Sequence, residues 1–366
     1  MVRVLARASC AVVLLAAIGS MAASADEIAD FYRGKRMTIL ISSTAGSGYD
    51  AYARLLARNI VRHIPGNPTM VAQNLPAAGG MVLLNTAYNT GARDGTLLFT
   101  LHFNLPLYQA MGGRGVQYDA GKLIGLGRLL ASNAVIGVAT NSKSGVRTLQ
   151  DAREREAVIG STGATSNSTV YPTILNNLTG TKFKVVTGYA GENGVFLAME
   201  RGETDGFGSF SYLTFKSVKP DYLANDVFRP IVQWGATRED AWPDVPTAID
   251  VAETPIDKRA MELASAGPDI GFSYFMPPEV PPARVAALRK AFDDMLADPA
   301  FKDEAERAKL FLRPASAQEV ERIVQNVVSA PPDVIERLRE LMVVKGGVRC
   351  EDYTKAEFCA KAASAQ

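Results

Sequence analysis

The sequence is poor in the residues on which most catalytic and metal sites depend. It contains two histidines, His63 and His102, and three cysteines in 366 residues. It also lacks the motifs His-Glu-x-x-His, Gly-x-Ser-x-Gly and Gly-x-x-x-x-Gly-Lys-Ser/Thr. These motifs supply the ligands of zinc proteases, the nucleophile of α/β-hydrolases and the phosphate loop of many NTPases. Since no group of His, Cys, Asp and Glu has metal-ligand spacing either, we expect no metal site, no cofactor and no catalytic residues.

An excess of charge of either sign is also missing. The chain carries 39 Lys and Arg against 38 Asp and Glu, a formal net charge of +1. Nucleic-acid-binding proteins gain affinity by releasing counterions from phosphates, and this needs a basic surface. A near-neutral chain also produces no long-range field that would steer an anion. We therefore expect no nucleic-acid partner, and any selectivity for charge must come from local groups.

Long apolar runs are absent apart from one short stretch near the N-terminus. Ala11–Ile18 is too short to cross a bilayer and follows a basic start at Arg3 and Arg7. The small residues Ala23-Ser24-Ala25 come shortly afterwards. This order is typical of a secretory signal peptide over residues 1–25, which is favoured over an uncleaved anchor helix. Because Cys10 lies before the apolar stretch and not at the cleavage point, a lipid anchor is not expected.

Cleavage near Ala25 would leave 341 of the 366 residues, too many for one compact core and enough for two domains. It would also leave two cysteines, Cys350 and Cys359, close to the C-terminus. In an oxidising compartment this pair predicts a disulfide. A structural disulfide that fixes the C-terminal segment is favoured over a redox or metal role, because there is no Cys-x-x-Cys spacing and no histidine nearby.

Short β-rich runs alternate with helical patterns through most of the chain. The expected strands are Met37–Ser42, Thr69–Asn74, Thr96–Leu101, Val135–Thr140, Ala157–Gly160, Lys182–Thr187 and Val227–Trp234. The expected helices between them are Tyr49–His63, Met81–Asn89, Leu149–Arg155, Thr169–Leu178 and Gly194–Arg201. From Pro281 onward the pattern is helical, over Pro282–Ala297, Pro299–Leu312 and Asp333–Val344. This alternation predicts α/β domains with mostly parallel sheets, and a helical tail that packs back on an early domain.

The loop Thr44–Asp50, TAGSGYD, follows the first expected strand and opens a helix. Gly46-x-Gly48-x-x-Ala51 fits a permissive form of the dinucleotide-binding fingerprint. A dinucleotide site also needs a carboxylate at the end of the second strand, which binds the ribose. Here the second strand ends Val71-Ala72-Gln73-Asn74, without a carboxylate. Dinucleotide binding is therefore not expected.

Four loops rich in glycine and hydroxyl groups each follow a strand and open a helix. They are Thr44–Asp50, Pro76–Gly80, Ser161–Ser168 and Tyr189–Gly194. Helix N-termini expose unpaired N–H groups and bind anions without any Lys or Arg, and glycine lets a ligand approach the backbone closely. Any one of these loops could be an ordinary βα turn. Four of them in one exported two-domain chain favour a site for a small carboxylate.

The two histidines have different expected roles. His63 comes at the end of a helix, where a donor side chain meets unpaired carbonyl groups, and a structural role is favoured over catalysis. His102 ends a strand, close to where ligands bind in open α/β sheets, so we include it among the candidate ligand contacts.

The loops, in this order, resemble the periplasmic receptors of the tripartite tricarboxylate transporter family. The resemblance covers nearly all of the chain after residue 25. It rests on GKRMTILISSTAGSGYDAYARLLAR, VAQNLPAAGG, RDGTLL, IGSTGATSNS, GYAGENG, RGETDGFG and WPDVPTAIDV. Each element alone is weak evidence, and together they are fairly specific.

The resemblance implies a two-lobed clamp like that of periplasmic binding proteins, in which the ligand lies between the lobes. Lobe one would comprise residues 26–128 and 236–366, and lobe two residues 129–235. In lobe one the ligand residues would be Ala45, Gly46, Ser47, Gly48, Asp50, Ala77, Ala78, Gly79 and Gly80. In lobe two they would be Ser161, Thr162, Gly163, Ser166, Tyr189, Gly191 and Asp205.

The chain departs from the family pattern at several of these positions. Ala77 and Ser47 stand where glycine is common, and Ala190 replaces a larger residue. The identity of the ligand therefore cannot be carried over from the family. Asp50 has two possible roles: it could cap its helix or support the loop, which is favoured, or it could accept a hydrogen bond from a ligand.

Together these features predict a receptor in the periplasm, not an enzyme, that binds a small organic carboxylate and delivers it to the membrane permease subunits of a tripartite transporter. We expect a monomer. Two alternatives remain. One is a secreted α/β enzyme that acts on a small carboxylate, and the other is a module that passes its bound state to a membrane sensor.

Overall fold

The computed structural model describes residues 27–343, except 164, 165, 188, 190, 214, 215, 217 and 218. The expected signal peptide and the expected Cys350–Cys359 disulfide lie outside the described residues. The chain forms two compact units. Unit one contains residues up to Leu101, Lys122–Gly127 and Phe272–Gln318, and unit two contains His102–Gly121, Arg128–Gly271 and residues from Glu319 onward. The lobes expected from the sequence, residues 26–128 with 236–366 and residues 129–235, stay a prediction.

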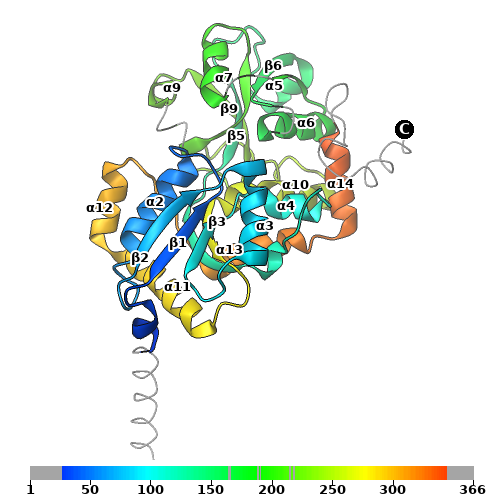
Figure 1. The fold of residues 1–366 in the computed structure, drawn as a ribbon. Coiled ribbons are helices and arrows are strands. Elements are labelled where there is room, and N and C mark those ends of the chain that lie inside the picture. The colour runs from blue at the N-terminus through cyan, green and yellow to red at the C-terminus, as the bar shows by residue number, and fades with distance from the viewer. Residues whose placement is uncertain are drawn as a thin grey trace, which may run out of the picture. The chain divides into compact units, whose positions relative to one another are not determined.

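Unit one is built on a six-stranded sheet with the order β11-β4-β10-β3-β1-β2. Its strands are β1 (Arg36–Ile41), β2 (Thr69–Asn74), β3 (Leu97–Thr100), β4 (Ile124–Leu130), β10 (Phe272–Met276) and β11 (Ala315–Ser316). Its helices are α2 (Gly48–Ile60), the 3-10 turn η1 (Ala77–Gly80), α3 (Met81–Thr90), α11 (Pro282–Ala297), α12 (Pro299–Arg307) and the start of α13 (Ala317–Val328). β1 lies between β2 and β3 and is parallel to both (Figure 1). β10 is antiparallel to β3.

Unit two is built on a five-stranded sheet with the order β7-β6-β8-β5-β9. Its strands are β5 (Ala134–Ala139), β6 (Glu156–Ser161), β7 (Lys182–Thr187), β8 (Gly206–Ser211) and β9 (Phe228–Trp234). Its helices are α4 (Leu105–Ala110), η2 (Ala120–Lys122), α5 (Leu149–Glu154), α6 (Asn167–Thr179), α7 (Gly191–Glu200), α9 (Pro220–Ala224), α10 (Pro255–Ile270) and α14 (Pro332–Met342). β6 is parallel to β7 and β8, and β5 is antiparallel to β8 and β9.

The two sheets repeat one arrangement. In each, a central strand (β1 or β6) has parallel partners on both sides, and the inner partner (β3 or β8) pairs with an antiparallel strand (β10 or β5). The predicted α/β class is confirmed, with sheets that are mixed and not wholly parallel. Both parallel pairs, β1–β2 and β6–β7, are followed by the glycine-rich loops that the sequence singled out.

β5 illustrates how the sequence builds a sheet that is covered on both faces. Ala134, Ile136 and Val138 face one hydrophobic cluster, which includes side chains of α6, α10 and α14. The alternate residues Val135 and Ala139 face a second cluster, which includes side chains of α7. Because successive side chains of a strand point to opposite faces, an uninterrupted apolar run marks a strand buried on both sides.

All seven expected strands and all eight expected helices are present, with ends that differ by a few residues. Thr148 and Asp151 form a capping box at the start of α5. Strands β4, β8, β10 and β11 were not expected from the sequence. The helical tail divides between the units: α11 and α12 pack on α2, whereas α14 packs on α6 and α10.

Candidate functional site

Two of the predicted loops lie beside each other in unit one. The parallel register of β1 and β2 pairs Ile41 with Asn74, so the carboxyl ends of both strands meet at one edge of the sheet. The loop after β1, residues 42–47, leads into α2, and we call it the Gly46 loop. The loop after β2, residues 75–80, leads into α3, and we call it the Gly79 loop. Each therefore ends at the N-terminus of a helix, where backbone N–H groups lack helical partners.

The conformation of the Gly46 loop depends on glycine and on a hydroxyl cap. Gly46 has φ of +80°, a left-handed conformation that other residues adopt at a cost. Ser47 is the N-cap of α2, and its Oγ accepts a hydrogen bond from the Asp50 N–H at 3.3 Å. A side chain at Gly48 would come within 2.9 Å of the Phe272 ring, so this glycine also allows α2 to pack on β10.

Asp50 supports this loop, the role favoured from the sequence. Its carboxylate accepts hydrogen bonds from the Gly46 N–H at 2.9 Å, from Arg54 Nε at 2.8 Å and from Asn74 Nδ2 at 2.9 Å. Asn74 Nδ2 also donates to the Ser43 carbonyl at 2.9 Å. The network joins the Gly46 loop to the end of β2. Since it uses the Gly46 N–H, that predicted donor is engaged within the protein.

Other backbone donors of the two loops remain available. Within the part of the chain that the structure describes, the N–H groups of Ala45, Gly48, Ala77 and Ala78 have no hydrogen-bond acceptor. All four residues are exposed. The nearby cation Arg54 donates to Asp50 and to Asn74 Oδ1 at 2.9 Å. An anion at these loops would therefore meet neutral N–H groups.

The Gly79 loop is a run of left-handed residues. Ala78, Gly79 and Gly80 have φ of 49°, 61° and 88°. A turn of this kind directs successive N–H groups into a concavity that suits an anion. Gly80 is the N-cap of α3 and offers no side-chain hydrogen bond to the helix. Because Ala in the left-handed region costs free energy, the conformation of Ala78 is held by its surroundings.

In unit two, the loop between β6 and α6 forms a network of hydroxyl groups. Ser161 is fully buried, and its Oγ lies 3.1, 2.8 and 2.7 Å from the hydroxyl oxygens of Ser166, Ser168 and Thr169. The Gly163 N–H donates to Ser161 Oγ at 3.3 Å, and the Thr162 N–H donates to Ser168 Oγ at 3.2 Å. The predicted residues Ser161, Thr162, Gly163 and Ser166 thus lie together.

Tyr189 and Gly191 lie next to this network. β7 is parallel to β6, with Thr187 opposite Ser161, and the Tyr189 N–H donates to the Ser161 carbonyl at 3.3 Å. Gly191 is the first residue of α7. Unit two therefore repeats the arrangement of unit one, with two helix N-termini that follow adjacent parallel strands.

Asp205 is not brought together with these residues. Its carboxylate accepts hydrogen bonds from Ser142 Oγ at 2.6 Å and from the Val158 N–H at 2.8 Å. It comes just before β8, which is parallel to β6. Asp205 therefore lies at the amino end of these strands, whereas Ser161 lies at the carboxyl end. Its contacts are structural, and they tie the start of β8 to β6 and to the segment after β5.

The two histidines have different surroundings. His63 Nε2 lies 3.2 Å from Asp298 Oδ2, and Asp298 is the N-cap of α12, so His63 joins two helices. His102 is half-buried and stacks on Phe103 with the ring centroids 4.9 Å apart. Burial lowers the pKa of His102 to about 4, so its imidazole is neutral at pH 7. A neutral imidazole can exchange hydrogen bonds with a ligand but offers it no charge.

Sequence reasoning missed part of the hydroxyl network. Ser168 and Thr169 were assigned to the loop end and to the helix, although their hydroxyl groups complete the network around Ser161. The signal was present in the sequence, because five of the residues from Ser161 to Thr169 that the structure describes carry a hydroxyl group.

Metal-ligand clusters and membrane-spanning helices are both missing from the described residues. Over this part of the chain, no group of three or more His, Cys, Asp and Glu side chains is arranged to hold a metal ion. Within the same residues, none of the helices has the length and apolar character needed to cross a membrane.

Comparison with known proteins gives a family and a fold. Residues 52–339 match the model of the tripartite tricarboxylate transporter family receptor. No curated protein matches the chain. A TctC solute-binding protein from Polaromonas has 19% sequence identity and a TM-score of 0.64, and the match covers 84% of this chain and 100% of that one.

Two further solved structures have similar folds. MatC from Rhodopseudomonas palustris, with bound malate, has 18% identity and a TM-score of 0.55, with 82% of this chain and 99% of that one covered. A second R. palustris protein, with adipate, has 18% identity and a TM-score of 0.57, and the match covers 84% of this chain and 97% of that one. The predicted fold of periplasmic binding proteins is thus confirmed. Because the family model covers most of its length, the chain belongs to the tripartite tricarboxylate transporter receptor family.

Proposed function

We propose that this receptor captures a small organic carboxylate in the periplasm and delivers it to the permease subunits of a tripartite transporter. One observation carries the proposal: the Gly46 loop and the Gly79 loop lie at one edge of one sheet and, among the described residues, offer backbone N–H groups that have no acceptor. N–H groups at helix N-termini favour an anion through both their hydrogen bonds and the helix dipole.

Backbone N–H groups can supply enough binding free energy to hold a carboxylate without a cationic side chain. A hydrogen bond from a backbone N–H to a carboxylate contributes about 1.5–3 kcal/mol. Three or four such bonds offset the desolvation of the ligand and leave about 8 kcal/mol, which corresponds to micromolar affinity. A chain with a net charge of +1 can therefore select an anion by local geometry alone.

Unit two, taken by itself, also offers polar groups to a ligand. Its Ser161 network offers hydroxyl groups, which act as donors or acceptors and adapt to a carboxylate, a hydroxyl or an amide. Two proteins of similar fold hold malate and adipate, which are both dicarboxylates. We therefore propose that dicarboxylates are among the ligands.

Calorimetric titration tests this proposal. Malate and adipate should bind with micromolar affinity, and their diamides, which keep the carbon chain but lack the charge, should bind at least about a hundredfold more weakly. Equal affinity for acids and diamides, or no binding of any mono- or dicarboxylate in a panel, would refute a carboxylate receptor. Turnover of a bound acid, followed by NMR, would instead favour the enzyme alternative.

Delivery to a permease is tested separately from capture. The ligand-loaded receptor should bind the membrane subunits of the transporter more tightly than the ligand-free receptor, measured with the subunits in detergent or nanodiscs. Binding to a membrane sensor in place of the permease would favour the sensing alternative. Light scattering in the same buffers should give the mass of a monomer.

A further inference from the structure

The ring of Phe272 packs against the first turn of α2. Phe272 begins β10, which is antiparallel to β3, so it lies at the edge of the sheet where β3 ends. The Gly46 loop lies at this same edge, because it follows β1 and β1 is parallel to β3. Cζ of the ring is 2.9 Å from the position that a Cβ would take at Gly48. The ring therefore reaches the residue that directly follows the Gly46 loop.

Two tyrosines of α2 confine this ring. Tyr49 meets it edge to face, with ring centroids 4.7 Å apart and an interplanar angle of 88°. Tyr52 stacks on it, with centroids 4.8 Å apart and an angle of 21°. Both tyrosines are buried, and Tyr52 Oη donates to the Phe311 carbonyl at 2.7 Å. Because such aromatic contacts are directional, the Phe272 ring cannot turn aside without losing both.

The start of the Gly46 loop is attached to the strand beside β10. Ser42 is the first residue of the loop, and its N–H donates to Thr100 Oγ1 at 2.8 Å. Thr100 is the last residue of β3 and pairs with Tyr274 of β10. The loop therefore starts at β3 and leads into a helical turn that rests on β10. Since these two strands are paired with each other, the loop and the turn share one base.

The first turn of α2 is thus held from two sides. The Asp50 network ties its polar side to β2, and the Phe272 ring packs on its other side. Among the residues that the structure describes, the N–H groups of Ala45 and Gly48 have no acceptor. The direction in which these two groups point depends on where the turn is held.

From these contacts we propose that Phe272 is a positioning residue of the carboxylate site. Its ring limits how closely the first turn of α2 approaches β10, and so it sets the direction of the Ala45 and Gly48 N–H groups. A hydrogen bond weakens steeply when its angle is bent, so a displaced turn loses affinity without any contact between Phe272 and the ligand. The inference rests on the proposed function, because these N–H groups are the proposed donors.

Titration of malate and adipate into a double-mutant cycle tests the inference. Gly48→Ala places a methyl group against the confined ring, so the turn must shift, and both acids should bind about tenfold more weakly. Phe272→Leu removes the tip of the ring and should weaken binding about threefold, because Asp50 still holds the turn. Adding Gly48→Ala to Phe272→Leu should change the affinity by less than about twofold, since the methyl group then meets no ring.

The cycle separates positioning from a direct effect on the ligand. If the methyl group acted by touching the acid, Gly48→Ala would weaken binding equally in both backgrounds, and the inference would be overturned. Wild-type affinity in Gly48→Ala or in Phe272→Leu would overturn it as well. Each of these results would leave the carboxylate receptor standing. If the wild type binds neither acid, the inference and the proposed function both fail.

Gly113→Ala is the matched control. A Cβ at Gly113, which follows α4 in unit two, would lie 2.2 Å from the Tyr108 ring, and neither Gly48 nor Gly113 has a left-handed backbone. This variant should lower the midpoint of urea unfolding and leave the affinity for both acids unchanged.

Urea unfolding of the cycle gives a readout that does not depend on the ligand. Gly48→Ala should lower the midpoint in the wild type. It should raise the midpoint in Phe272→Leu, because the methyl group occupies space that the ring has left and alanine favours a helix more than glycine does. An equal fall in both backgrounds would mean that the ring does not limit the turn, and it would overturn the inference.

Discussion

At the scale of single residues, Asp50 shows how a charged side chain can serve an anion site without facing the anion. Burial alone would raise its pKa, but the hydrogen bonds from the Gly46 N–H, Asn74 and Arg54 outweigh burial and lower it. The side chain therefore stays ionised at pH 7. Its negative charge is balanced within the network, so it supports the Gly46 loop without requiring a donor from a ligand.

Asp50→Ala should lower the free energy of unfolding by about 1–3 kcal/mol, because it removes the carboxylate that accepts from the Gly46 N–H, Arg54 and Asn74. It should also weaken carboxylate binding, since the Gly46 loop loses its anchor. Urea unfolding at pH 7 and calorimetry measure the two effects. Asp30→Ala is the control at an exposed ion pair and should cost less than about 0.5 kcal/mol. An equal cost for both variants would contradict the supporting role of Asp50.

Asp269 and His102 should give pH dependences of opposite sign. Burial raises the pKa of Asp269 to about 6, so the folded state binds this proton more tightly than the unfolded state. The contribution of Asp269 to the free energy of unfolding is greatest below about pH 4 and falls as the pH rises through 6. The pKa of His102 is lowered to about 4, so its contribution is greatest above about pH 6.5 and falls on acidification.

Replacing each residue with Asn separates the two contributions. Asp269→Asn keeps an acceptor for the Ala236 N–H, which donates to Asp269 Oδ2 at 3.0 Å. Between pH 6 and 4 its stability should fall more steeply than that of the wild type, and the stability of His102→Asn should fall less steeply. Urea unfolding at pH 4.5, 5.5 and 7 measures these slopes. Identical slopes for all three proteins would contradict the pKa values.

Several site residues could be predicted from the sequence because their roles are local. A glycine after a strand and before a helix signals a loop with left-handed backbone, as Gly46 and Gly79 show. The role of Asp205 could not be predicted this way. Its hydrogen bonds to Ser142 and Val158 depend on which strands are neighbours in the sheet, and strand order is not a local property.

At the scale of elements, β8 shows why a glycine-rich strand was not predicted from the sequence. β8, with the sequence GFGSFS, has low propensity because of its glycines. Those glycines are required by packing. A Cβ at Gly206 would lie 2.3 Å from the Gly137 carbonyl oxygen, and one at Gly208 would lie 1.9 Å from the Ser168 carbonyl oxygen. Glycine in a strand thus marks a close backbone approach that only the folded structure reveals.

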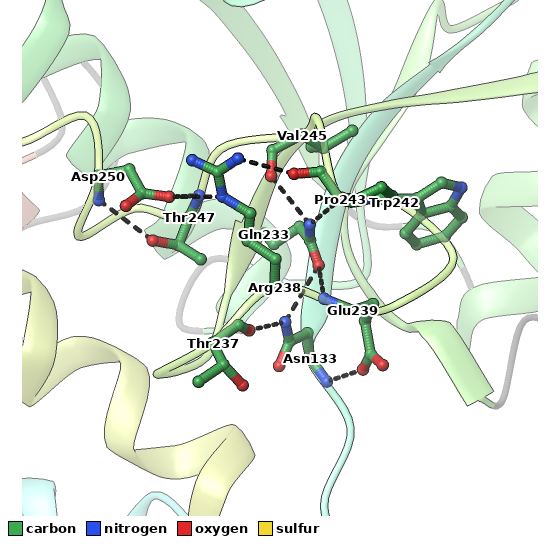
Figure 2. Close-up of polar contacts among 10 residues, drawn as sticks. All are labelled: Asn133, Gln233, Thr237, Arg238, Glu239, Trp242, Pro243, Val245, Thr247 and Asp250. Carbon is green, nitrogen blue, oxygen red and sulfur yellow. Dashed lines mark hydrogen bonds and ion pairs between the residues drawn. The ribbon is translucent and has the colours of Figure 1, made fainter.

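The segment after β9 should depend on Gln233 for its stability. Gln233→Met keeps the length of the side chain but removes one hydrogen-bond partner each from Asn133 Nδ2, the Glu239 N–H and the Trp242 carbonyl. We expect a loss of at least about 2 kcal/mol in the free energy of unfolding. Gln150→Met, at an exposed position of α5, should change it by less than about 0.5 kcal/mol. A small effect at Gln233 would mean that the network of Figure 2 does not hold this segment.

At the scale of the whole molecule, the same arrangement of strands and helix N-termini occurs in both units. Each unit places two helix N-termini after adjacent parallel strands, at β1 and β2 in unit one and at β6 and β7 in unit two. The loops differ in chemistry: unit one offers backbone N–H groups and unit two offers hydroxyl groups. The composition predicted a near-neutral binding protein. It did not reveal that one unit offers backbone N–H groups and the other offers hydroxyl groups.

The central claim is that the loops of unit one bind the carboxylate through their backbone, and four glycines offer a matched test. Gly46 and Gly79 lie in the loops, whereas Gly180 and Gly202 lie at the C-terminal ends of α6 and α7. All four have positive φ, between 61° and 80°, and a Cβ added at any of them would meet no atom within 4 Å. Each substitution by Ala should therefore cost a similar amount, about 1 kcal/mol, in stability.

The decisive measurement is calorimetric titration of these four Gly→Ala variants with the dicarboxylate that the wild type binds most tightly. We predict that Gly46→Ala and Gly79→Ala weaken binding by about tenfold or more, because the new methyl group and the altered backbone displace the donors. Gly180→Ala and Gly202→Ala should bind as the wild type does, despite the same loss of stability. Wild-type affinity in the two loop variants, or equal weakening in all four, would contradict the account.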